Sequence, residues 1–444
     1  MSTINNNKKK ILIISYFFAP MNEIGAIRVT KMANSLSKKG WDVEVLTSIP
    51  NKYQKHESTN DSTLIIEKNI KVTAVPFPIF LKAMYKLKSI IIGKHSTSKE
   101  KKIAQTDYEV KSPFLNYIAY LKIKIISYLL FVKARKKINK KNKYDLVLSS
   151  YGPIYTLYFS KFIKKHMNDV KYIQDLRDRI IYPNDYKNKY LYRYKVGLEK
   201  MVSVYSDMVL TVSLSALKQH KYISLFHNIE QITNGYNIED IISRDKFFND
   251  GFYHIYYGGR VYPDQDPGLL SKAILKTKYK DIIKIDYAGN QFIDFKSKFS
   301  PLLNNNIINH GFISRKDSLM HQQTSNMNLL LSWNSNGDEG VFTGKVFELL
   351  NANRPVTAII SGDKTNAVIE EMFIADENKK CFYYKNGEKD LLELVAFIEE
   401  QIDDYLVNGM KVLKKYNKEL YKDFSYDVIL ERFHIVVNKL ISEK

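Results

Sequence analysis

The sequence predicts an α/β protein of two domains, each built on a parallel sheet, with helices at the C-terminal end. Its 444 residues exceed one ordinary hydrophobic core, so two domains of about 200 residues each are expected. Short apolar, β-branched runs alternate with stretches of helical spacing, which is the pattern of parallel strands joined by helices. This alternation fills the first half of the chain and restarts after Asn234-Gly235.

The first half opens with a strand, a loop, a helix and a second strand. Residues 10–15 form an apolar run of the kind that fills a buried parallel strand. From Ile27 apolar residues recur at helical spacing, Gly40 ends the helix, and residues 41–47 follow as the next strand. Turn residues and helical patterns bound the further strands expected at 146–149, 171–175 and 208–212.

The second half predicts another sheet and then helices. Its five expected strands are residues 252–257, 282–288, 305–311, 328–331 and 355–360. Residues 390–444 carry apolar positions at helical spacing. We therefore expect domains at 1–245 and 246–415, and a final helix at 416–444 that packs back on the first domain.

Composition narrows the class of protein. Hydrophobic residues make up 45% of the chain and charged residues 26%, which excludes a mainly disordered chain. The single cysteine, Cys381, cannot form an intrachain disulfide and favours a reducing cytoplasm. Lys and Asn interrupt every apolar run before the roughly eighteen residues of a spanning helix, so no transmembrane helix is expected. The basic N-terminus leads through an apolar run into a loop and a helix, without a convincing cleavage site for a signal peptide.

A net charge of +21 indicates an anionic partner, although a general richness in Lys, Asn and Ile accounts for part of it. Much of the charge lies in residues 80–143, where lysines interleave with Tyr, Phe, Ile and Leu. This basic amphipathic insertion has two interpretations. It lies on an anionic membrane, at the inner face of the plasma membrane, or it is a core helix with a solvated basic end. No nucleic-acid motif accompanies the charge, so a nucleic-acid partner is not expected.

The loop after the first strand carries Gly25 and Arg28. Ligands of open α/β sheets gather at the carboxyl ends of strands, and a glycine at a helix start lets the backbone approach a phosphate or sugar. Arg28, one turn into the helix, is suited to pair with a phosphate. A plain turn glycine with a surface arginine is the alternative, and the full glycine-rich dinucleotide fingerprint is absent.

Two further loops end neighbouring strands of the first domain. Asp175, Arg177 and Asp178 follow one strand, where they form structural salt bridges or orient an acceptor hydroxyl. Tyr151 and Gly152 follow another strand and are expected to line the same crevice.

In the second domain, a glycine-containing loop feeds a helix that begins near Thr343, Gly344 and Lys345. The first turn of a helix offers free N–H groups and a positive dipole end to an anion, and Lys345 adds a full charge. Glu348 lies on the same helical face, where it can bind ribose hydroxyls. The alternative is a capped helix, with Thr343 as the cap.

The last loop is Tyr257-Gly258-Gly259-Arg260, at the end of the first strand of the second domain. An arginine after two glycines can reach a diphosphate without steric hindrance, although a solvated arginine is the alternative. These glycine-bearing or charged loops at strand ends, spread over both domains, together indicate a ligand site.

At these residues the sequence resembles the family 4 glycosyltransferases of the GT-B fold, particularly bacterial members in capsule and O-antigen synthesis. The likeness covers nearly the whole chain. The opening ILIISYFFAPMNEIGAIR, DLVLSSYGP and YIQDLRD resemble landmarks of the family's acceptor domain. YYGGRVYPDQDP resembles the loop that contacts the donor diphosphate, and FTGKVFELL the start of the donor-binding helix. The resemblance implies two Rossmann-like domains that face each other across a cleft.

The resemblance also assigns roles to residues. On the acceptor side it implies binding by Arg28, Tyr151 and Asp175, and a catalytic part for Arg177 or Asp178. His310-Gly311-Phe312-Ile313 resembles the strand end whose backbone reads the nucleobase. The donor-binding set it implies is Gly25, Gly259, Arg260, Ile313, Thr343, Gly344, Lys345 and Glu348, of which Arg260 and Lys345 stabilise the departing diphosphate.

Some positions depart from the family's pattern. The usual motif is a pair of glutamates eight residues apart, and Glu348 matches the second while Gly340 replaces the first. A lysine often found five residues after the loop arginine is here Gln265. Lys345 is the expected substitute.

The implied reaction transfers a hexosyl group, with retained configuration, from a nucleoside-diphosphate sugar to a glycan or polyprenyl-linked acceptor. No cofactor and no metal are expected: the pair Asp264 and Asp266 precedes Pro267 and is interpreted as the start of a helix rather than a metal clamp. Two alternatives stay open: a sugar-nucleotide 2-epimerase of the same fold, and a non-catalytic partner that binds a nucleotide or a glycan.

Overall fold

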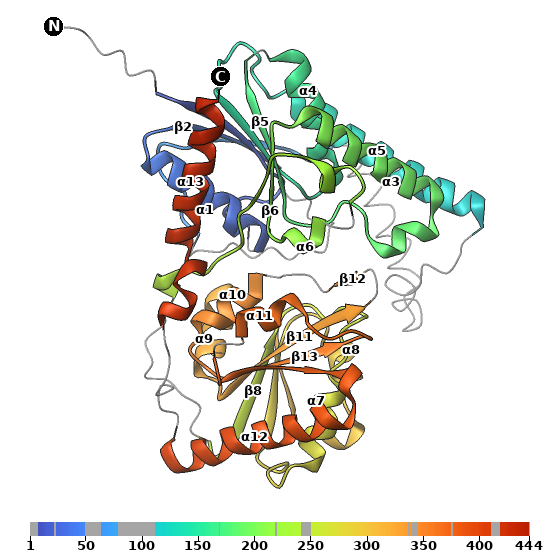
Figure 1. Ribbon diagram of the computed structural model, residues 1–444, viewed down its shortest axis with the longest axis vertical. Coiled ribbons are helices and arrows are strands. Elements are labelled where there is room, and N and C mark those ends of the chain that lie inside the picture. Colours follow the sequence, from blue (N-terminus) through green and yellow to red (C-terminus); the bar gives the residue numbers. More distant parts are fainter. Residues whose placement is uncertain are drawn as a thin grey trace, which may run out of the picture. The chain divides into compact units, whose positions relative to one another are not determined.

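The protein folds into two compact units, drawn in Figure 1. Unit 1 comprises Met1–Thr233 and Leu430–Lys444, and unit 2 comprises Asn234–Ile429. The expected boundary at residue 245 lies outside the described residues. The computed structural model describes residues 8–21, 24–48, 64–78, 112–167, 169–217, 220–240, 250–335, 338–339, 344–373, 376–409 and 418–443.

Unit 1 is built on a seven-stranded sheet with the order β3-β2-β1-β4-β5-β6-β7, in which every pair of neighbours is parallel. The residues Ile11 to Ile14 of the central strand are all buried, because helices cover both faces of such a sheet. Successive strands proceed outward from β1 in one direction as far as β3, and the chain then resumes at β4 on the other side of β1. The strands are β1 (Lys10–Ile14), β2 (Asp42–Ser48), β3 (Lys71–Val75), β4 (Leu146–Ser150), β5 (Lys171–Leu176), β6 (Met208–Thr211) and β7 (Ile229–Gln231).

The helices of unit 1 connect these strands. Helix α1 ends where expected, because Gly40 adopts a φ of +90° that few side chains tolerate. The C-terminal helix α13 (Tyr426–Ser442) begins in unit 2 and continues in unit 1, where His434 Nε2 lies 2.9 Å from Ser35 Oγ of α1. The other helices are α1 (Ile24–Lys38), α3 (Pro113–Arg135), α4 (Tyr158–His166), α5 (Lys189–Tyr205) and α6 (Leu214–Leu217), with 3-10 turns η2 (Ile154–Leu157), η3 (Pro183–Lys187) and η4 (Ile223–Leu225).

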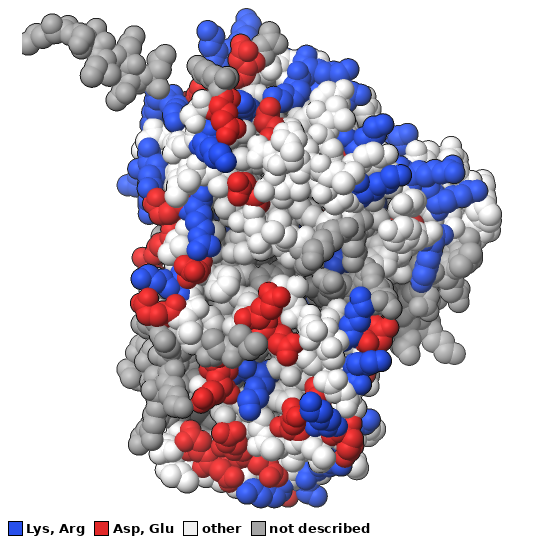
Figure 2. Space-filling model, in the orientation of Figure 1, with Lys and Arg blue, Asp and Glu red and all other residues white. Residues whose placement is uncertain are grey.

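Helix α3 departs from the expectation that no helix is long and apolar enough to span a membrane. Among the described residues, α3 meets that criterion by its length and composition. Its C-terminal half nevertheless belongs to unit 1, since Phe131 and Ala134 are buried in the core beside α4. The surface over α3 and α5 shows Lys and Arg side chains with almost no Asp or Glu between them (Figure 2).

Unit 2 repeats the plan of unit 1 with six parallel strands in the order β10-β9-β8-β11-β13-β14. The short strand β12 (Asp338–Glu339) pairs antiparallel with the end of β11. The chain again starts in the middle of the sheet, at β8, and crosses to the other side at β11. The six strands are β8 (Tyr253–Gly258), β9 (Ile283–Ala288), β10 (Ile307–Gly311), β11 (Met327–Ser335), β13 (Val356–Ser361) and β14 (Lys379–Tyr383).

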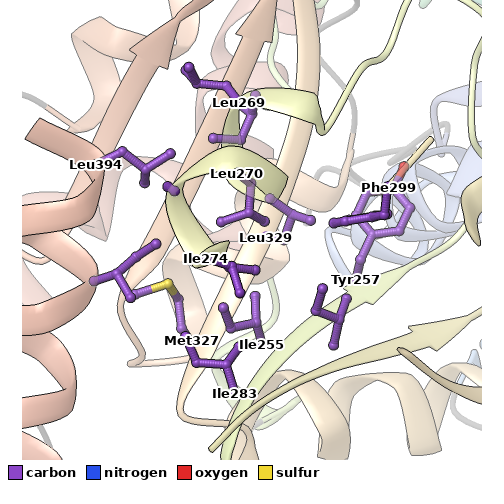
Figure 3. Packing of buried hydrophobic residues seen from close by; sticks show 14 of the residues in the cluster. Ile255, Tyr257, Leu269, Leu270, Ile274, Ile283, Phe299, Met327, Leu329 and Leu394 are labelled. Carbon is purple, nitrogen blue, oxygen red and sulfur yellow. The ribbon is translucent and has the colours of Figure 1, made fainter. Parts of the chain in front are cut away.

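Helices also connect the strands of unit 2 and complete its core. Leu270 and Ile274 of α7 point toward the sheet residues Ile255 and Leu329, and Leu394 of α12 packs beside them (Figure 3). The helices are α7 (Gly268–Lys276), α8 (Phe292–Lys296), α9 (Arg315–Thr324), α10 (Gly344–Asn351), α11 (Val368–Phe373) and α12 (Glu388–Asn408), with 3-10 turns η5 (Ile238–Asp240), η6 (Pro301–Leu303), η7 (Tyr384–Asn386) and η8 (Lys418–Phe424).

The predicted α/β fold class is confirmed, with two parallel sheets and C-terminal helices. Every expected strand is present, but four strands were not expected: β3, β7, β14 and the two-residue strand β12. The first three lie at sheet edges. Their sequences are short or start with lysine, as in Lys379-Lys380 of β14, so they lack the continuous apolar run of a buried strand.

Candidate functional site

In unit 1 the strand order reverses between β1 and β4, and ligands of open α/β sheets bind outside the carboxyl ends of the strands at such a point. Arg177, just after β5, joins the loops that leave this edge. Its Nε and Nη2 atoms donate hydrogen bonds to the Tyr151 carbonyl oxygen at 3.2 and 2.8 Å, and its guanidinium lies 5.5 Å from the ring centroid of Phe17. The structure thus brings together the three loops that the sequence analysis singled out in this unit.

Two glycines make room for this guanidinium group. A Cβ atom on Gly25 would lie 3.1 Å from Arg177 Cζ and still nearer to Nη1. A Cβ atom on Gly152, whose φ is +107°, would lie 3.1 Å from Arg177 Nη2. Gly25 therefore serves the placement of Arg177, in addition to any approach of a ligand to its backbone.

Asp178 and Tyr151 add titratable groups beside Arg177. Asp178 is accessible by surface area, yet protein atoms crowd its carboxyl, and this burial raises its pKa while Arg177 works against the rise. Tyr151 is buried at 7% exposure, and burial, with the negative charges of Asp178 and Asp185, raises the pKa of its hydroxyl. Tyr151 therefore keeps its proton at any physiological pH.

Arg28 and Asp175 require a correction. Arg28 is 1% exposed and Asp175 is fully buried. Arg28 Nη2 and Nε donate to the two carboxylate oxygens of Asp175 at 2.9 and 3.4 Å, while Nη1 donates to the Thr233 carbonyl at 2.6 Å. Ser150 Oγ donates to Asp175 Oδ2 at 2.9 Å. Both groups are occupied inside unit 1, so the structure supports a structural salt bridge and not the expected contacts with phosphate or acceptor.

In unit 2 the strand order reverses between β8 and β11, and the loop after β8 meets the start of α10 there. Lys345, the second residue of α10, places Nζ 4.6 Å from the ring centroid of Tyr257. A Cβ atom on Gly259, whose φ is +117°, would lie 2.5 Å from Lys345 Cε. The glycine is therefore required both by its backbone conformation and by the lysine that lies against it.

Lys345 is half-buried by surface area, yet protein atoms crowd its ammonium group. Burial lowers its pKa to about 8, and the charge of Glu348 offsets only part of this effect. Among the described residues, no carboxylate forms a salt bridge with it. A buried cation without a paired anion is costly unless something binds it. The arrangement therefore indicates an anion site between the glycine loop and the first turn of α10.

Glu348, one turn further along α10, is held by neighbouring side chains. Arg315 Nε donates to its Oε1 atom and Gln322 Nε2 to its Oε2 atom, both at 3.3 Å. Arg315 in turn bonds Asp240 at 2.6 Å. Each Glu348 oxygen keeps a further acceptor position for a ligand hydroxyl. Gly344 is buried at the helix start, and Thr343 lies outside the described residues.

Gln265 stabilises the loop that carries Arg260. Its Oε1 atom accepts from Tyr262 N at 2.9 Å and from Tyr257 Oη at 3.2 Å, and its Nε2 atom donates to the Leu331 carbonyl at 2.6 Å. The loop also folds through Tyr257 Oη, which donates to the Arg260 carbonyl at 2.6 Å. The Arg260 side chain is exposed. The residue in place of the family's lysine is thus a buried structural amide.

The remaining expected residues lie along the same edge of the sheet. Ile313 is half-buried in the turn between β10 and α9. Asp266 Oδ1 accepts from Gly268 N at 2.8 Å at the start of α7, as the interpretation of this acidic pair as a helix start predicts. Among the described residues, no group of three or more His, Cys, Asp or Glu side chains is placed to hold a metal ion.

A buried network that the sequence does not reveal lies behind the Ile313 turn. Asp286 of β9 accepts from His254 Nδ1 and from His310 Nε2, both at 2.6 Å. Burial alone would raise the pKa of Asp286, but the two histidines outweigh it and the pKa is lowered. The network fixes the end of β10, from which residues 311–313 continue. Only the parallel register of the strands, with Asp286 opposite Tyr256 and Ile308, brings these groups together.

Comparison with solved structures identifies the fold. No protein-family model matches the sequence, and no curated protein sequence matches it. The lipopolysaccharide outer core galactosyltransferase WaaB, in its apo form, is 13% identical over 97% of this chain and 99% of its own, with a TM-score of 0.54. HepE of Anabaena, in complex with UDP and glucose, is 12% identical over 97% and 99%, with a TM-score of 0.56.

An alpha,alpha-trehalose 6-phosphate synthase of Burkholderia multivorans is 9% identical over 98% of this chain and 99% of its own, with a TM-score of 0.58. Identities this low establish the fold and leave the substrates open. The matches nevertheless span both units of the chain. The chain therefore has the GT-B fold of glycosyltransferases, with two Rossmann-like α/β units and C-terminal helices.

Proposed function

We propose that the protein is a retaining glycosyltransferase that moves a hexosyl group from a nucleoside-diphosphate sugar to a hydroxyl of a glycan or polyprenyl-linked acceptor. In this proposal the enzyme acts in the synthesis of capsule, O-antigen or another cell-surface polysaccharide. One observation carries the proposal: Lys345 lies against Gly259 at the switch point of the sheet of unit 2, where protein atoms crowd its ammonium group and no described carboxylate forms a salt bridge with it.

A diphosphate fits this site by charge. Lys345 supplies one positive charge, the N-terminus of α10 carries the positive end of the helix dipole, and Arg260 stands at the exposed end of the glycine loop. When the bond to the sugar breaks, negative charge grows on the departing phosphate, and fixed cations stabilise that charge without reorganisation. HepE of Anabaena, which shares the fold, is bound to UDP and glucose, and this supports a donor of that class.

Other residues of unit 2 fit the rest of the donor. Arg315 and Gln322 hold the Glu348 carboxylate. Each of its oxygens keeps a further acceptor position, as binding of ribose hydroxyls requires. The backbone of Ile313 follows a strand end fixed by the Asp286 network, which suits it to read a nucleobase. The proposal requires no metal or cofactor.

The acceptor is assigned to the switch point of unit 1. Arg177 and Tyr151 supply hydrogen-bond donors there, and Asp178 supplies a carboxylate whose pKa burial has raised. A carboxylate of raised pKa is a better base than an ordinary one near neutral pH. In a front-face retaining transfer the departing phosphate can itself accept the acceptor's proton. Asp178 then orients the hydroxyl.

The test uses the full chain and a panel of nucleotide sugars. A bound donor raises the midpoint of thermal unfolding, since it stabilises the folded state by mass action. We expect one donor class to do so with the wild type and with Lys272→Met, which removes an exposed lysine of α7, but not with Lys345→Met. A shift that survives in Lys345→Met, or the absence of any shift in the wild type, contradicts the proposal.

Turnover then separates the alternatives. A glycosyltransferase releases nucleoside diphosphate only when an acceptor is present, apart from slow hydrolysis. An epimerase converts the sugar nucleotide with no acceptor, and a binding partner consumes none with any acceptor tried. Either of these two results would replace the proposed activity while leaving the donor site intact.

A further inference from the structure

The N-terminal part of α3 exposes an apolar stripe. Phe114, Ile118 and Ile125 are 70%, 45% and 52% exposed, and Tyr128 is 53% exposed. With the half-buried Leu121 they recur at steps of four and three residues, so they share one face of the helix. Soluble surfaces rarely expose such a continuous apolar row, which therefore indicates a binding surface.

Other residues of α3, beside the stripe, fix the helix in unit 1. The rings of Tyr117 and Tyr120 contact the ring of Tyr190 on α5, with centroids 5.2 and 6.3 Å apart. Asn188 Nδ2, at the N-cap of α5, donates to the Asn116 carbonyl at 2.9 Å. The stripe is thus presented by a helix held in place on a folded domain.

Positive charge accompanies the stripe. Residues 112–143 contain nine Lys or Arg and no Asp or Glu. Lys122 and Lys124 lie on either side of the stripe, and both are exposed. Exposed Lys189 and Arg193 of α5 extend the basic surface, on which Figure 2 shows Lys and Arg with almost no Asp or Glu between them. An apolar row edged by lysines matches a layer of acyl chains beneath anionic headgroups.

A spanning orientation does not fit this helix. Phe131 and Ala134, on its last turns, are buried in the core of unit 1, and Lys122 and Lys124 interrupt the middle of the apolar segment. Charges at the centre of a bilayer are costly, whereas lysines beside an interfacial helix reach the headgroups.

We propose that α3 docks unit 1 on an anionic lipid surface, with Phe114, Ile118, Ile125 and Tyr128 in the interface and the flanking lysines at the headgroups. This surface is independent of Lys345 and the donor, so its failure and the failure of the glycosyltransferase proposal are distinguishable. It brings the protein to the membrane where a polyprenyl-linked acceptor would reside.

The test is cosedimentation of the full chain with vesicles of phosphatidylcholine containing about one quarter phosphatidylglycerol. We expect binding that weakens by about 10-fold or more without the anionic lipid or at about 0.5 M salt, because surface charge is screened. Ile118→Asp with Ile125→Asp should abolish binding, and Lys122→Gln with Lys124→Gln should weaken it several-fold. Binding to neutral vesicles of equal strength, or none to either vesicle, overturns the proposal.

The matched control is Ile293→Asp, at a residue of α8 that is 82% exposed and lies in unit 2. It should leave vesicle binding unchanged. The α3 variants should keep the midpoint of thermal unfolding of the wild type, because the substituted positions are exposed. An unchanged midpoint would show that the variants fold. A wild type that sediments as a dimer without lipid, and becomes a monomer in the Ile118→Asp with Ile125→Asp variant, would assign the stripe to a second copy instead and overturn the proposal.

Discussion

The guanidinium group of Arg177 occupies the space that a side chain at residue 25 would need. Arg177 follows β5 and Gly25 lies in the first turn of α1, so the two residues connect two elements at the switch point of unit 1. Phe17 and the Tyr151 carbonyl hold the arginine from other sides. The glycine and the arginine therefore act as one structural pair, which a double-mutant cycle can detect.

Gly25→Ala should destabilise the protein by about 1–3 kcal/mol, because the added methyl group displaces Arg177 or shifts the backbone. In an Arg177→Ala background most of that cost should disappear, since alanine is the better residue within a helix. Chemical denaturation of the four proteins measures the coupling.

Gly197→Ala is the matched control for this cycle. It lies in α5, and a Cβ atom there would meet nothing within 4 Å. It should stabilise the protein by about 0.5–1 kcal/mol through helix propensity alone. If Gly25→Ala lowers the free energy of unfolding equally in the wild type and in Arg177→Ala, then Gly25 and Arg177 do not act as a structural pair.

Lys345→Met should have opposite effects on catalysis and on stability. Loss of the ammonium lowers the transfer rate by about 100-fold or more, as does Arg260→Ala, because each removes a fixed charge partner of the departing phosphate. In the absence of donor, Lys345→Met should raise the free energy of unfolding by about 1–2 kcal/mol, since protein atoms crowd the charge and no described carboxylate pairs with it. Steady-state kinetics and denaturation of the same preparations check both effects, and a destabilised variant would contradict this account of the site.

The affinity for a nucleoside diphosphate should fall as the pH rises through about 8, because burial lowers the pKa of Lys345 to about 8 and the anion binds the protonated form. The free energy of unfolding of the unliganded protein should instead increase as the pH rises. The folded pKa is depressed, so the cost of burying the charge is fully present below about 8 and disappears as the pH rises toward 10.5. Calorimetric titrations of the protein with a nucleoside diphosphate, between about pH 6.5 and 9.5, should show that binding takes up protons near pH 8. This proton uptake should be absent in Lys345→Met. An affinity of the wild type for nucleoside diphosphate that does not change with pH would contradict the assignment of Lys345 as the anion-binding group.

Asp175→Asn should cost about 3 kcal/mol or more of stability, because it leaves the buried Arg28 without its counter-charge. A plain acceptor-binding residue would instead raise KM without changing the unfolding midpoint. Denaturation and kinetics on Asp175→Asn separate the two roles, and Asp178→Asn, at the neighbouring accessible carboxyl, is the comparison.

The sequence predicted the sites at the level of loops better than at the level of side chains. Gly25, Tyr151, Gly259 and Lys345 follow or face strand ends, and topology alone gathers such loops at two switch points. The pairing of Arg28 with Asp175 could not be predicted, because the spacing of Arg28 in α1 does not reveal which face is buried or that Asp175 lies opposite. Those facts depend on tertiary packing.

The Asp286 network was invisible for a related reason. His254, Asp286 and His310 lie on three different strands, and only the register of the strands makes them neighbours. The membrane and core interpretations of the 80–143 segment each describe part of α3, whose one face packs against unit 1 while the other is exposed. Residues 79–111 lie outside the described residues.

The division of the chain has a consequence for how the protein is made. The polypeptide leaves unit 1 at Thr233 and returns to it only at Leu430, and Phe433, Val437 and Leu440 of α13 are buried. A ribosome must therefore synthesise residues 234–429 before unit 1 receives its last core residues. Expression of residues 1–233 alone, or a tag that disturbs the final helix, would leave that unit with an open hydrophobic surface that invites chaperones and proteases.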